Sequence, residues 1–197
     1  MRFARKTSFA TLTAALGLAF AGAAFAQAGT VQRDVNQQQR IEQGLQSGSL
    51  TTREAARLER EEARVQRDQA RAMQDGKLSP AEKARLAREQ DRVSRDIYRE
   101  KHDAQTGDPN SASSRRMQAD VQRNVNQQRR IEQGVRSGSL TTQEAARLER
   151  GEARNSRQEA RAGADGHVGK GEQRRVQKNE DRESRRIHRE KHDAQHK

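Results

Sequence analysis

Arginine is the residue type whose spacing most clearly suggests chemistry in this chain. A guanidinium group binds phosphate or carboxylate through paired hydrogen bonds. The arginines recur every three or four residues, which places them on one face of a helix. Two runs with this spacing are the candidate anion-binding residues: Arg57, Arg60, Arg64, Arg67 and Arg71, followed by Arg147, Arg150, Arg154, Arg157 and Arg161.

An alternative interpretation of the same runs is a solvated face that is neutralised by ion pairs. Acidic residues precede the arginines by three positions, as Glu61 precedes Arg64 and Asp68 precedes Arg71. Such pairs stabilise a helix without binding anything. In the second run Glu61 and Asp68 are replaced by Gly151 and Gln158 while the arginines remain. Unpaired arginine is what an anionic partner requires, so the second run favours binding.

Histidine provides the only metal signal in the sequence. His188, His192 and His196 are spaced so that one helix face would carry all three, and a pair four residues apart can chelate Zn²⁺, Cu²⁺ or Ni²⁺. The first half of the chain has Tyr98, His102 and Thr106 at the corresponding places, and basic residues surround the three histidines. A chance line of surface histidines is therefore the alternative to a periplasmic metal-binding site.

Catalysis has no candidate residues. The chain contains no Cys, and no Ser-His-acid arrangement stands out. Every carboxylate on the predicted helices has an Arg within one turn, which should lower its pKa and make it a poor general acid. We therefore expect a protein that is not an enzyme and that needs no cofactor.

Composition excludes several other classes of protein. From Gln27 onward only 23 of 171 residues are Val, Leu, Ile, Met or Tyr, so any core is small. The whole chain has 40 basic and 28 acidic residues and a net charge of +12. Tyr98 is the only aromatic residue in this stretch, and single-strand binders rely on aromatic stacking, so sequence-specific nucleic-acid recognition is not expected. A largely disordered polycation remains an alternative.

The first 26 residues are predicted to be a signal peptide. A basic start is followed by an apolar run too short to span a bilayer, and Ala24 and Ala26 are the small residues that a signal peptidase requires before Gln27. Cleavage leaves 37 basic and 28 acidic residues, a net charge of +9, and no transmembrane span in the mature chain. We expect a periplasmic or secreted protein of a Gram-negative bacterium.

A tandem duplication organises the rest of the chain. At an offset of 90 residues, 48 of 75 aligned positions are identical, from Val31 with Val121 to Gln105 with Gln195. The small polar residues 106–114 are typical of a flexible linker. Two modules are therefore predicted, residues 27–105 and 115–197.

Each module is predicted to contain three amphipathic helices, which makes the fold all-α. A nested repeat of 28 residues, or four heptads, indicates helix-and-turn units. Capping boxes at Thr51 and Ser79, and glycines at 48 and 76, mark the turns. The helices are expected at residues 31–46, 52–74 and 80–102, with counterparts in the second module. That module is expected to be looser, because interior glycines replace helix-forming residues at positions such as 151 and 163.

Two resemblances accompany this interpretation. The run from Arg40 to Gly44, the run from Leu50 to Arg60 and the ending from Tyr98 to Asp103 resemble small exported helical proteins of Gram-negative bacteria, which implies export. The segment from Leu140 to Glu144 is weakly similar to the Leu-Thr-x-x-Gln motif of Spy-type periplasmic chaperones, with Gln143 one place early. This second resemblance implies a stress-protective or chaperone-like role.

These observations together predict a non-enzymatic binding or scaffold protein of the cell envelope. Its expected partner is an anionic envelope component or an unfolded protein, and a homo-oligomer is compatible with the helical repeats. Metal binding through the histidines is the main alternative function.

Overall fold

Six α-helices form the part of the chain that is described here by a computed structural model, which covers the backbone of residues 17–193 and the side chains of residues 27–193. The predicted all-α fold is confirmed, so the chain is not the mostly disordered polycation considered above. The helices are α1 (Gly17–Ser47), α2 (Thr52–Ala72), α3 (Pro80–Lys101), α4 (Ala112–Ser137), α5 (Thr142–Ala162) and α6 (Lys170–Lys191).

The predicted capping boxes set where the helices begin. Thr51 and Ser79 accept hydrogen bonds from the backbone N–H groups of Glu54 and Glu82, and these glutamates accept from the capping residues in return. Thr141 makes the same arrangement at the start of α5. Gly48 has φ +76° in the turn after α1, a conformation that L side chains rarely adopt. Local sequence therefore fixes the helix boundaries.

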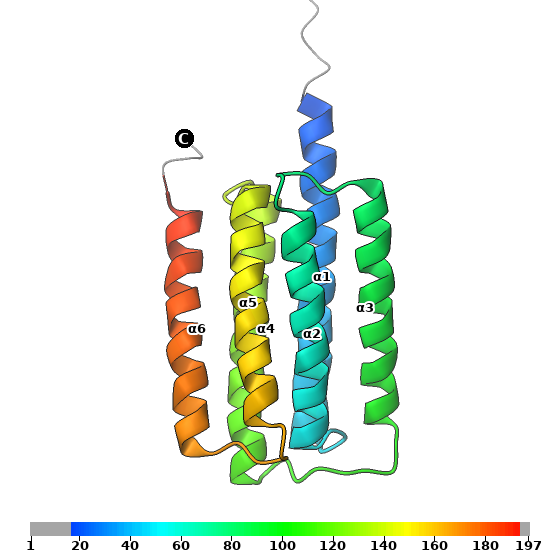
Figure 1. Cartoon of the computed structure of the whole chain (residues 1–197), viewed down its shortest axis with the longest axis vertical. Helices are drawn as coiled ribbons and strands as arrows, with labels where there is room; N and C mark the ends of the chain where they lie inside the picture. The colour runs from blue at the N-terminus through cyan, green and yellow to red at the C-terminus, as the bar shows by residue number, and fades with distance from the viewer. Residues whose placement is uncertain (1–16, 194–197) are drawn as a thin grey trace, which may run out of the picture.

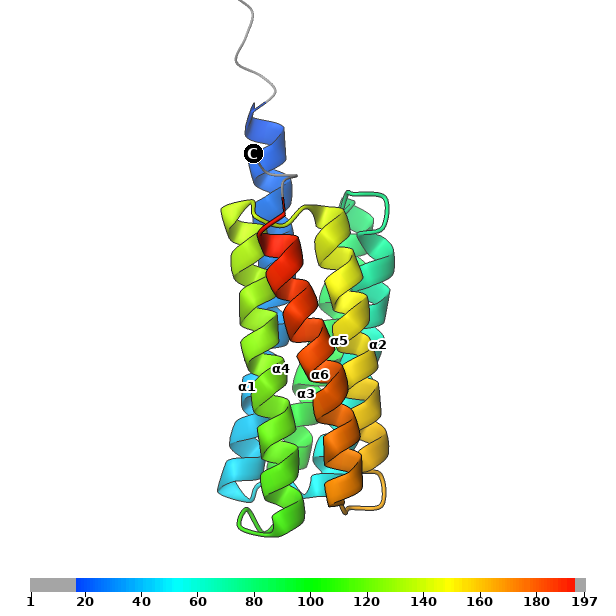
Figure 2. The same ribbon diagram turned by 90° about the vertical axis from the view of Figure 1, so that its left-hand side faces the viewer.

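The two copies of the repeat do not fold side by side as separate modules. α1 packs most closely against α4, and α2 against α5, so the closest neighbours come from different copies. α3 lies against α1 and α2 on one side, and α6 lies against α4 and α5 on the other (Figures 1 and 2). Because α2 and α5 run in opposite directions (Figure 1), the start of α2 lies beside the end of α5. The result is one bundle built from both copies.

Both apolar clusters of the core combine residues from the two copies. One holds Ile41, Leu45 and Leu58 with Met117 and Val121 among its members, and the other holds Ala28 and Val31 with Ile131, Val135 and Leu148. On α1 and α4 the two clusters occupy opposite ends, and polar residues such as Gln38 and Gln128 lie between them. The core is thus apolar at its ends and polar in its middle.

The structure gives no sign that the second copy is looser. α2 and α5 are both 21 residues long, and α3 and α6 are both 22 residues long. The glycines on which that expectation rests make room for neighbouring side chains. Gly151 faces the carboxylate of Glu183, and a Cβ at Gly163 would lie 2.8 Å from the Cβ of Ala56. These glycines allow close packing at the helix interfaces, and the lower stability of the second copy stays a prediction.

The segment predicted to be a flexible linker is held at several points. The backbone N–H of Gly107 donates to the carbonyl oxygen of Gly48 at 2.8 Å. Ser111 caps α4, so residues 112–114 of the predicted linker belong to that helix. The connection between the copies is therefore packed against the α1–α2 turn.

The predicted signal peptide lies entirely outside the residues whose side chains are described. Residues 1–16 lie outside the described part, and Ala24 and Ala26 lie within the backbone of α1 with their side chains undescribed. The first turns of α1 extend past the ends of the neighbouring helices (Figure 1). Within residues 17–193, no helix combines the length and the apolar character needed to cross a membrane.

Candidate anion-binding surface

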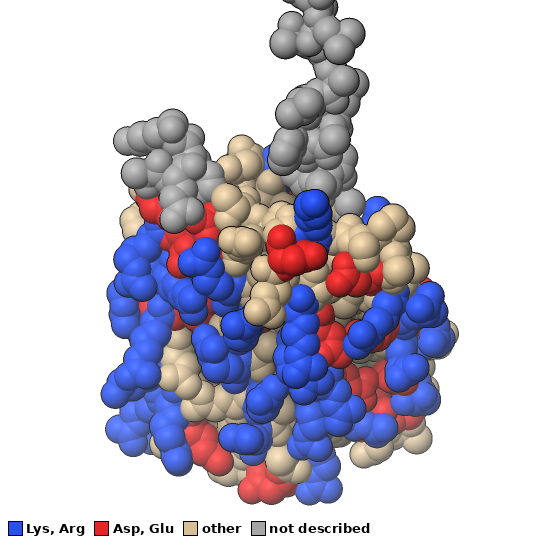
Figure 3. Space-filling model, turned by 45° about the horizontal axis from the view of Figure 1, so that its top comes forward, with Lys and Arg blue, Asp and Glu red and all other residues tan. Residues whose placement is uncertain are grey.

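The structure brings the two predicted arginine runs onto neighbouring helices. Nearly all of these residues are exposed, and Arg67 is intermediate, as expected for positions on the helix face opposite the buried Leu58 and Leu148. Five of them line one groove, which crosses from α2 to α5: Arg60, Arg64 and Arg67 from α2 with Arg157 and Arg161 from α5. Basic side chains cover much of the face seen in Figure 3. Each copy therefore contributes half of a shared basic surface.

Ion pairs neutralise the first run more than the second. Arg67, Arg71 and Arg85 all pair with Asp68, at 3.2, 3.5 and 3.6 Å. Arg57 pairs with the nearly buried Glu100 at 3.2 Å. The predicted pair Asp68–Arg71 forms, and Asp96 pairs with Arg99 at the same spacing in α3. Arg57 and Arg85 instead pair with acids four residues later, Glu61 and Glu89.

The second run keeps most of its charge free. Among the described residues, Arg150, Arg157 and Arg161 form no ion pair, and Arg154 reaches Glu183 only at 4.0 Å. Arg147 donates from Nε to the backbone carbonyl of Gln143 at 3.3 Å. The contrast follows from the exchange of Asp68 for Gln158 that the sequence already displays.

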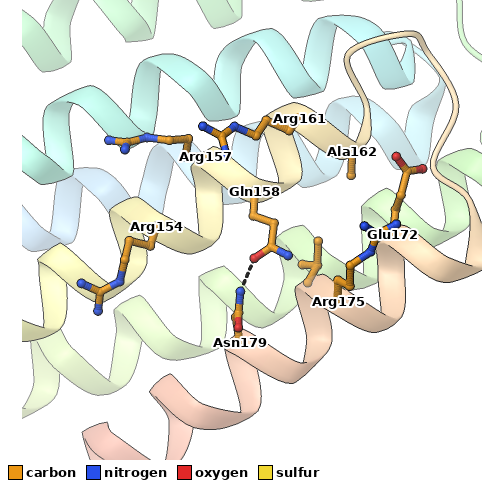
Figure 4. A pocket seen from close by; sticks show the side chains of 9 residues that line it. Arg154, Arg157, Gln158, Arg161, Ala162, Glu172, Arg175 and Asn179 are labelled. Carbon is orange, nitrogen blue, oxygen red and sulfur yellow. Dashed lines mark hydrogen bonds between the residues drawn. The ribbon is translucent and has the colours of Figure 1, made fainter.

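A second groove lies between α5 and α6 and is shown in Figure 4. Arg154, Arg157 and Arg161 reach it from α5, and Arg175 reaches it from α6. Ala162 and Val176 add apolar lining, and the amide of Asn179 donates to Gln158 across the groove. The sequence predicted three of these arginines as site residues and did not single out the groove itself.

A belt of buried acidic residues crosses the middle of the bundle, and the sequence reasoning missed it. Glu59 and Glu62 of α2, and Glu149, Glu152 and Glu159 of α5, are fully buried. Asp34, Asp120 and Glu180 join them from α1, α4 and α6. We call these eight residues the acidic belt.

Amide side chains supply many of the hydrogen bonds within the belt. Gln38 donates to Glu59 at 3.1 Å, and Gln128 donates to Glu149 at 3.2 Å. Asn124 donates to Glu159 at 2.7 Å. The carboxylate oxygens of Glu62 have no hydrogen-bond partner among the described residues, and neither do those of Glu152. A buried charged carboxylate without partners is costly, so these groups favour the protonated form.

Burial raises the pKa values throughout the belt. It brings the pKa of Asp34, Glu59 and Asp120 to about 7 and that of Glu180 to about 9. Burial also raises the pKa of Glu62 well above its usual value, and the nearby Asp34, Glu59, Glu61 and Glu149 raise it further. The prediction that neighbouring arginines hold the pKa of helix carboxylates low is wrong for the belt. Arg123 does lower the pKa of Asp120 and of Glu180, but burial raises both values by more.

The spacing of the acids contained a signal that could have revealed the belt. Glu59, Glu62, Gln66 and Gln69 are separated by three, four and three residues, and residues 149, 152, 156 and 159 repeat this spacing. That is the spacing of a core-facing helix stripe, here occupied by polar residues. The apolar residues Leu58 and Val65 mark only part of the buried face of α2, and a search for apolar residues does not detect the polar stripe beside them.

The predicted histidine ladder is only partly described. His188 and His192 are exposed, with ring centroids 4.3 Å apart, and Nδ1 of His192 lies 2.7 Å from the carbonyl oxygen of His188. α6 ends at Lys191, so His192 is the capping residue, and His196 lies outside the described residues. Tyr98 and His102 make a similar ring contact and the same hydrogen bond at the end of α3. The arrangement matches a recurring helix end, and metal binding stays a prediction.

Two groups of carboxylates within residues 27–193 have the spacing of metal ligands. They are Glu54, Glu100 and Asp103, and the corresponding Glu144, Glu190 and Asp193. Glu54 also accepts the backbone N–H of Thr51 in its capping box, and Glu100 pairs with Arg57 and Arg99. These acids therefore already have structural roles at the ends of the helices.

The comparisons with known proteins add no relative. No family model, no curated protein and no solved structure matches this chain.

Proposed function

We propose that the protein is an exported, non-enzymatic binding or scaffold protein of the cell envelope, which holds an anionic partner on the basic surface of α2 and α5. The observation that carries this proposal is the groove between the two helices. Arg60 and Arg64 line it from the first copy, and Arg157 and Arg161 line it from the second. Helix periodicity explains why each run is exposed, but it does not require two basic runs to lie side by side.

The juxtaposition of these arginines favours a ligand over a merely solvated face. Like charges on neighbouring helices repel one another and destabilise the fold unless they are kept apart or paired with acids. Acidic residues are abundant in the chain, with 28 in all, yet Arg157 and Arg161 form no ion pair among the described residues. A phosphate or carboxylate group in the groove would relieve the repulsion and accept the free guanidinium hydrogens.

The character of the surface also favours an anionic polymer or headgroup over an unfolded protein. Chaperones that hold unfolded chains usually offer them apolar surface. Tyr98 is the only large hydrophobic residue exposed within the described part, and it is 61% exposed. An unfolded client could therefore be held mainly through its own acidic residues, which makes the chaperone-like role secondary.

Export rests on the sequence signal, and the geometry is compatible with it. Cleavage before Gln27 removes the turns of α1 that extend past the bundle in Figure 1. Gln27 itself is buried, and Ala28 belongs to an apolar cluster of the core. The mature chain would thus begin where the packed bundle begins.

A charge-preserving substitution tests the proposal. Changing Arg60, Arg64, Arg157 and Arg161 to Lys keeps the net charge but removes the planar fork that binds oxyanions through two hydrogen bonds. We expect binding of polyphosphate, followed by fluorescence anisotropy at low salt, to weaken at least tenfold. A control with Arg88, Arg92, Arg95 and Arg129 changed to Lys should bind as the unaltered protein does.

Two outcomes would contradict the proposal. Absence of polyphosphate binding at low salt would leave the charge as a device for solubility and helix stability. Equal weakening of both variants, with affinity lost in parallel as salt rises, would indicate unspecific attraction between polyions.

A further inference from the structure

The groove between α5 and α6 differs from its counterpart in the first copy by two charges. The four arginines occur in both copies, because Arg64, Arg67, Arg71 and Arg85 correspond to Arg154, Arg157, Arg161 and Arg175. Two acids do not persist: Asp68 corresponds to Gln158, and Glu89 corresponds to Asn179. The same framework of helices thus presents one neutralised groove and one basic groove.

In the first copy the two acids form ion pairs with the arginines of the groove. Asp68 forms ion pairs with Arg67, Arg71 and Arg85, and Glu89 accepts a hydrogen bond from Nε of Arg85 at 2.9 Å. Both acids are largely shielded, with side chains 16% and 25% exposed. Three of the four guanidinium groups, those of Arg67, Arg71 and Arg85, thus already have a carboxylate partner, so a further anion would gain little there.

In the second copy the amides bind each other, and among the four arginines only Arg154 has an ion pair among the described residues, with Glu183 at 4.0 Å. Asn179 donates its amide hydrogen to the side-chain oxygen of Gln158, which links α5 to α6 without any charge. Arg157 and Arg161 form no ion pair among the described residues. Arg175 donates from Nε only to the backbone carbonyl of Gly171, at 3.3 Å.

Glu172 is the one acidic residue that lines this groove, and its carboxylate already accepts a backbone hydrogen bond. Glu172 accepts the backbone N–H of Gly169 at 2.9 Å and thereby caps α6. Figure 4 shows its carboxylate at the end of the groove nearest the turn, with Arg157 and Arg154 farther along α5. The groove therefore carries four guanidinium groups against one carboxylate.

We propose that this groove is a discrete binding site for a phosphate group, held by Arg157 and Arg161 of α5 and Arg175 of α6. The inference rests on the proposed function and adds one site of one chemistry beside the α2–α5 groove, with which it shares Arg157 and Arg161. A phosphate group carries up to two charges and several acceptor oxygens, so it can satisfy three guanidinium forks at once. A single carboxylate offers two oxygens and one charge and would leave at least one fork unpaired.

Exchanging the distinguishing residues between the copies tests the site in both directions. Gln158→Asp with Asn179→Glu introduces the acids of the first copy, and we expect binding of inorganic phosphate to weaken at least tenfold by isothermal titration calorimetry. Asp68→Gln with Glu89→Asn should open the first groove and raise the stoichiometry from one phosphate per chain to two. Each substitution uses a residue that the other copy already accommodates, and circular dichroism verifies the helices.

A matched control separates the site from the overall charge. Asn126→Asp with Gln133→Glu adds the same two negative charges at exposed positions of α4, away from the groove. This variant should bind phosphate within about twofold of the unaltered protein. Equal loss in the control and in the groove variant would overturn the inference.

Polyphosphate binding, measured in parallel, distinguishes failure of the site from failure of the proposed function. If polyphosphate binds but inorganic phosphate does not, the discrete site is wrong and the wider basic surface stands. If neither binds, both proposals are wrong. Acetate is the third probe, and binding of acetate as tight as that of phosphate would refute selectivity for phosphate.

Discussion

Glu180 offers the sharpest test of the acidic belt, because the first copy has Gln90 at the same place. Glu180 is buried, lies near Asp120 and Arg123, and has a pKa raised by burial to about 9. Gln90 is equally buried and donates to the carbonyl oxygen of Thr30 and to Asp34. Glu180→Gln should therefore fit the site while removing its titration.

The size of the effect follows from the difference between the folded and unfolded pKa. Unfolding exposes Glu180, whose pKa returns to its ordinary value of 4.5, so the unfolded chain releases a proton that the folded chain keeps. The free energy of unfolding then falls as pH rises from about 4.5 to about 9, by about 1.4 kcal/mol per pH unit. Between pH 5.5 and 7.5 this single group costs about 2 to 3 kcal/mol. Asp34, Glu59 and Asp120, with pKa values of about 7, add to the same slope up to that pH.

Urea denaturation at pH 5.5 and pH 7.5 measures the slope. We expect the unaltered protein to be less stable at pH 7.5, and we expect Glu180→Gln to recover about 2 kcal/mol of that loss, or several degrees in Tm. Asp181→Asn is the matched control, since this exposed neighbour pairs with the same Arg123 at 2.7 Å. Asp181 adds only to the rise that burial produces in the pKa of Glu180, so this variant should keep most of the slope. Identical slopes in all three proteins, or stability that rises with pH in the unaltered one, would refute the reasoning.

Three further predictions concern packing, backbone and metal. Gly151→Glu alone should lower stability by about 1 to 3 kcal/mol because Glu183 fills that space, and adding Glu183→Val should restore much of the loss. If urea denaturation shows that the effects of the two substitutions simply add, the two positions do not compensate each other. Gly48→Ala should cost at least about 1 kcal/mol in thermal unfolding, since the residue has φ +76° and a Cβ would lie 2.8 Å from the carbonyl oxygen of Gly107; an unchanged Tm would argue against this turn. If the histidines bind metal, Zn²⁺ should bind at micromolar concentration by calorimetry and His192→Ala should abolish it, whereas binding that survives the substitution would exclude the ladder.

Local structure was predictable from the sequence because its determinants are local. The capping boxes at Thr51, Ser79 and Thr141 each involve residues three apart, so they can be recognised without knowing the fold. The exposure of the arginine runs follows equally from helix periodicity. What the periodicity could not supply is the identity of the facing helix. The short turns of each copy are compatible with a separate three-helix module. The pairing of α2 with α5 instead depends on contacts between the two copies, which no local pattern reveals.

The acidic belt was missed for a different reason. Sequence reasoning assigns Glu to the surface because burying a charge is costly, and that rule holds for most proteins. Here the chain has so few large apolar residues after Gln27 that the helix faces available for burial must include Glu and Gln. The cost is reduced by protonation and by amide donors such as Gln38 and Gln128. A small apolar content can therefore indicate a polar core as well as a disordered chain.

Exchanges between the two copies support the contacts that the structure places between helices of the same copy. Asp34 lies near Gln69 in the first copy, whereas Asn124 binds Glu159 in the second, so acid and amide have traded places across the same contact. Glu61 and Val93 likewise correspond to Gly151 and Glu183, and the carboxylate moves from α2 in one copy to α6 in the other. Independent drift would leave such partners mismatched. Paired exchange is instead the result expected where each position is constrained by its neighbour across the helix interface, and it explains why glycines that look disruptive in the sequence coincide with intact helices.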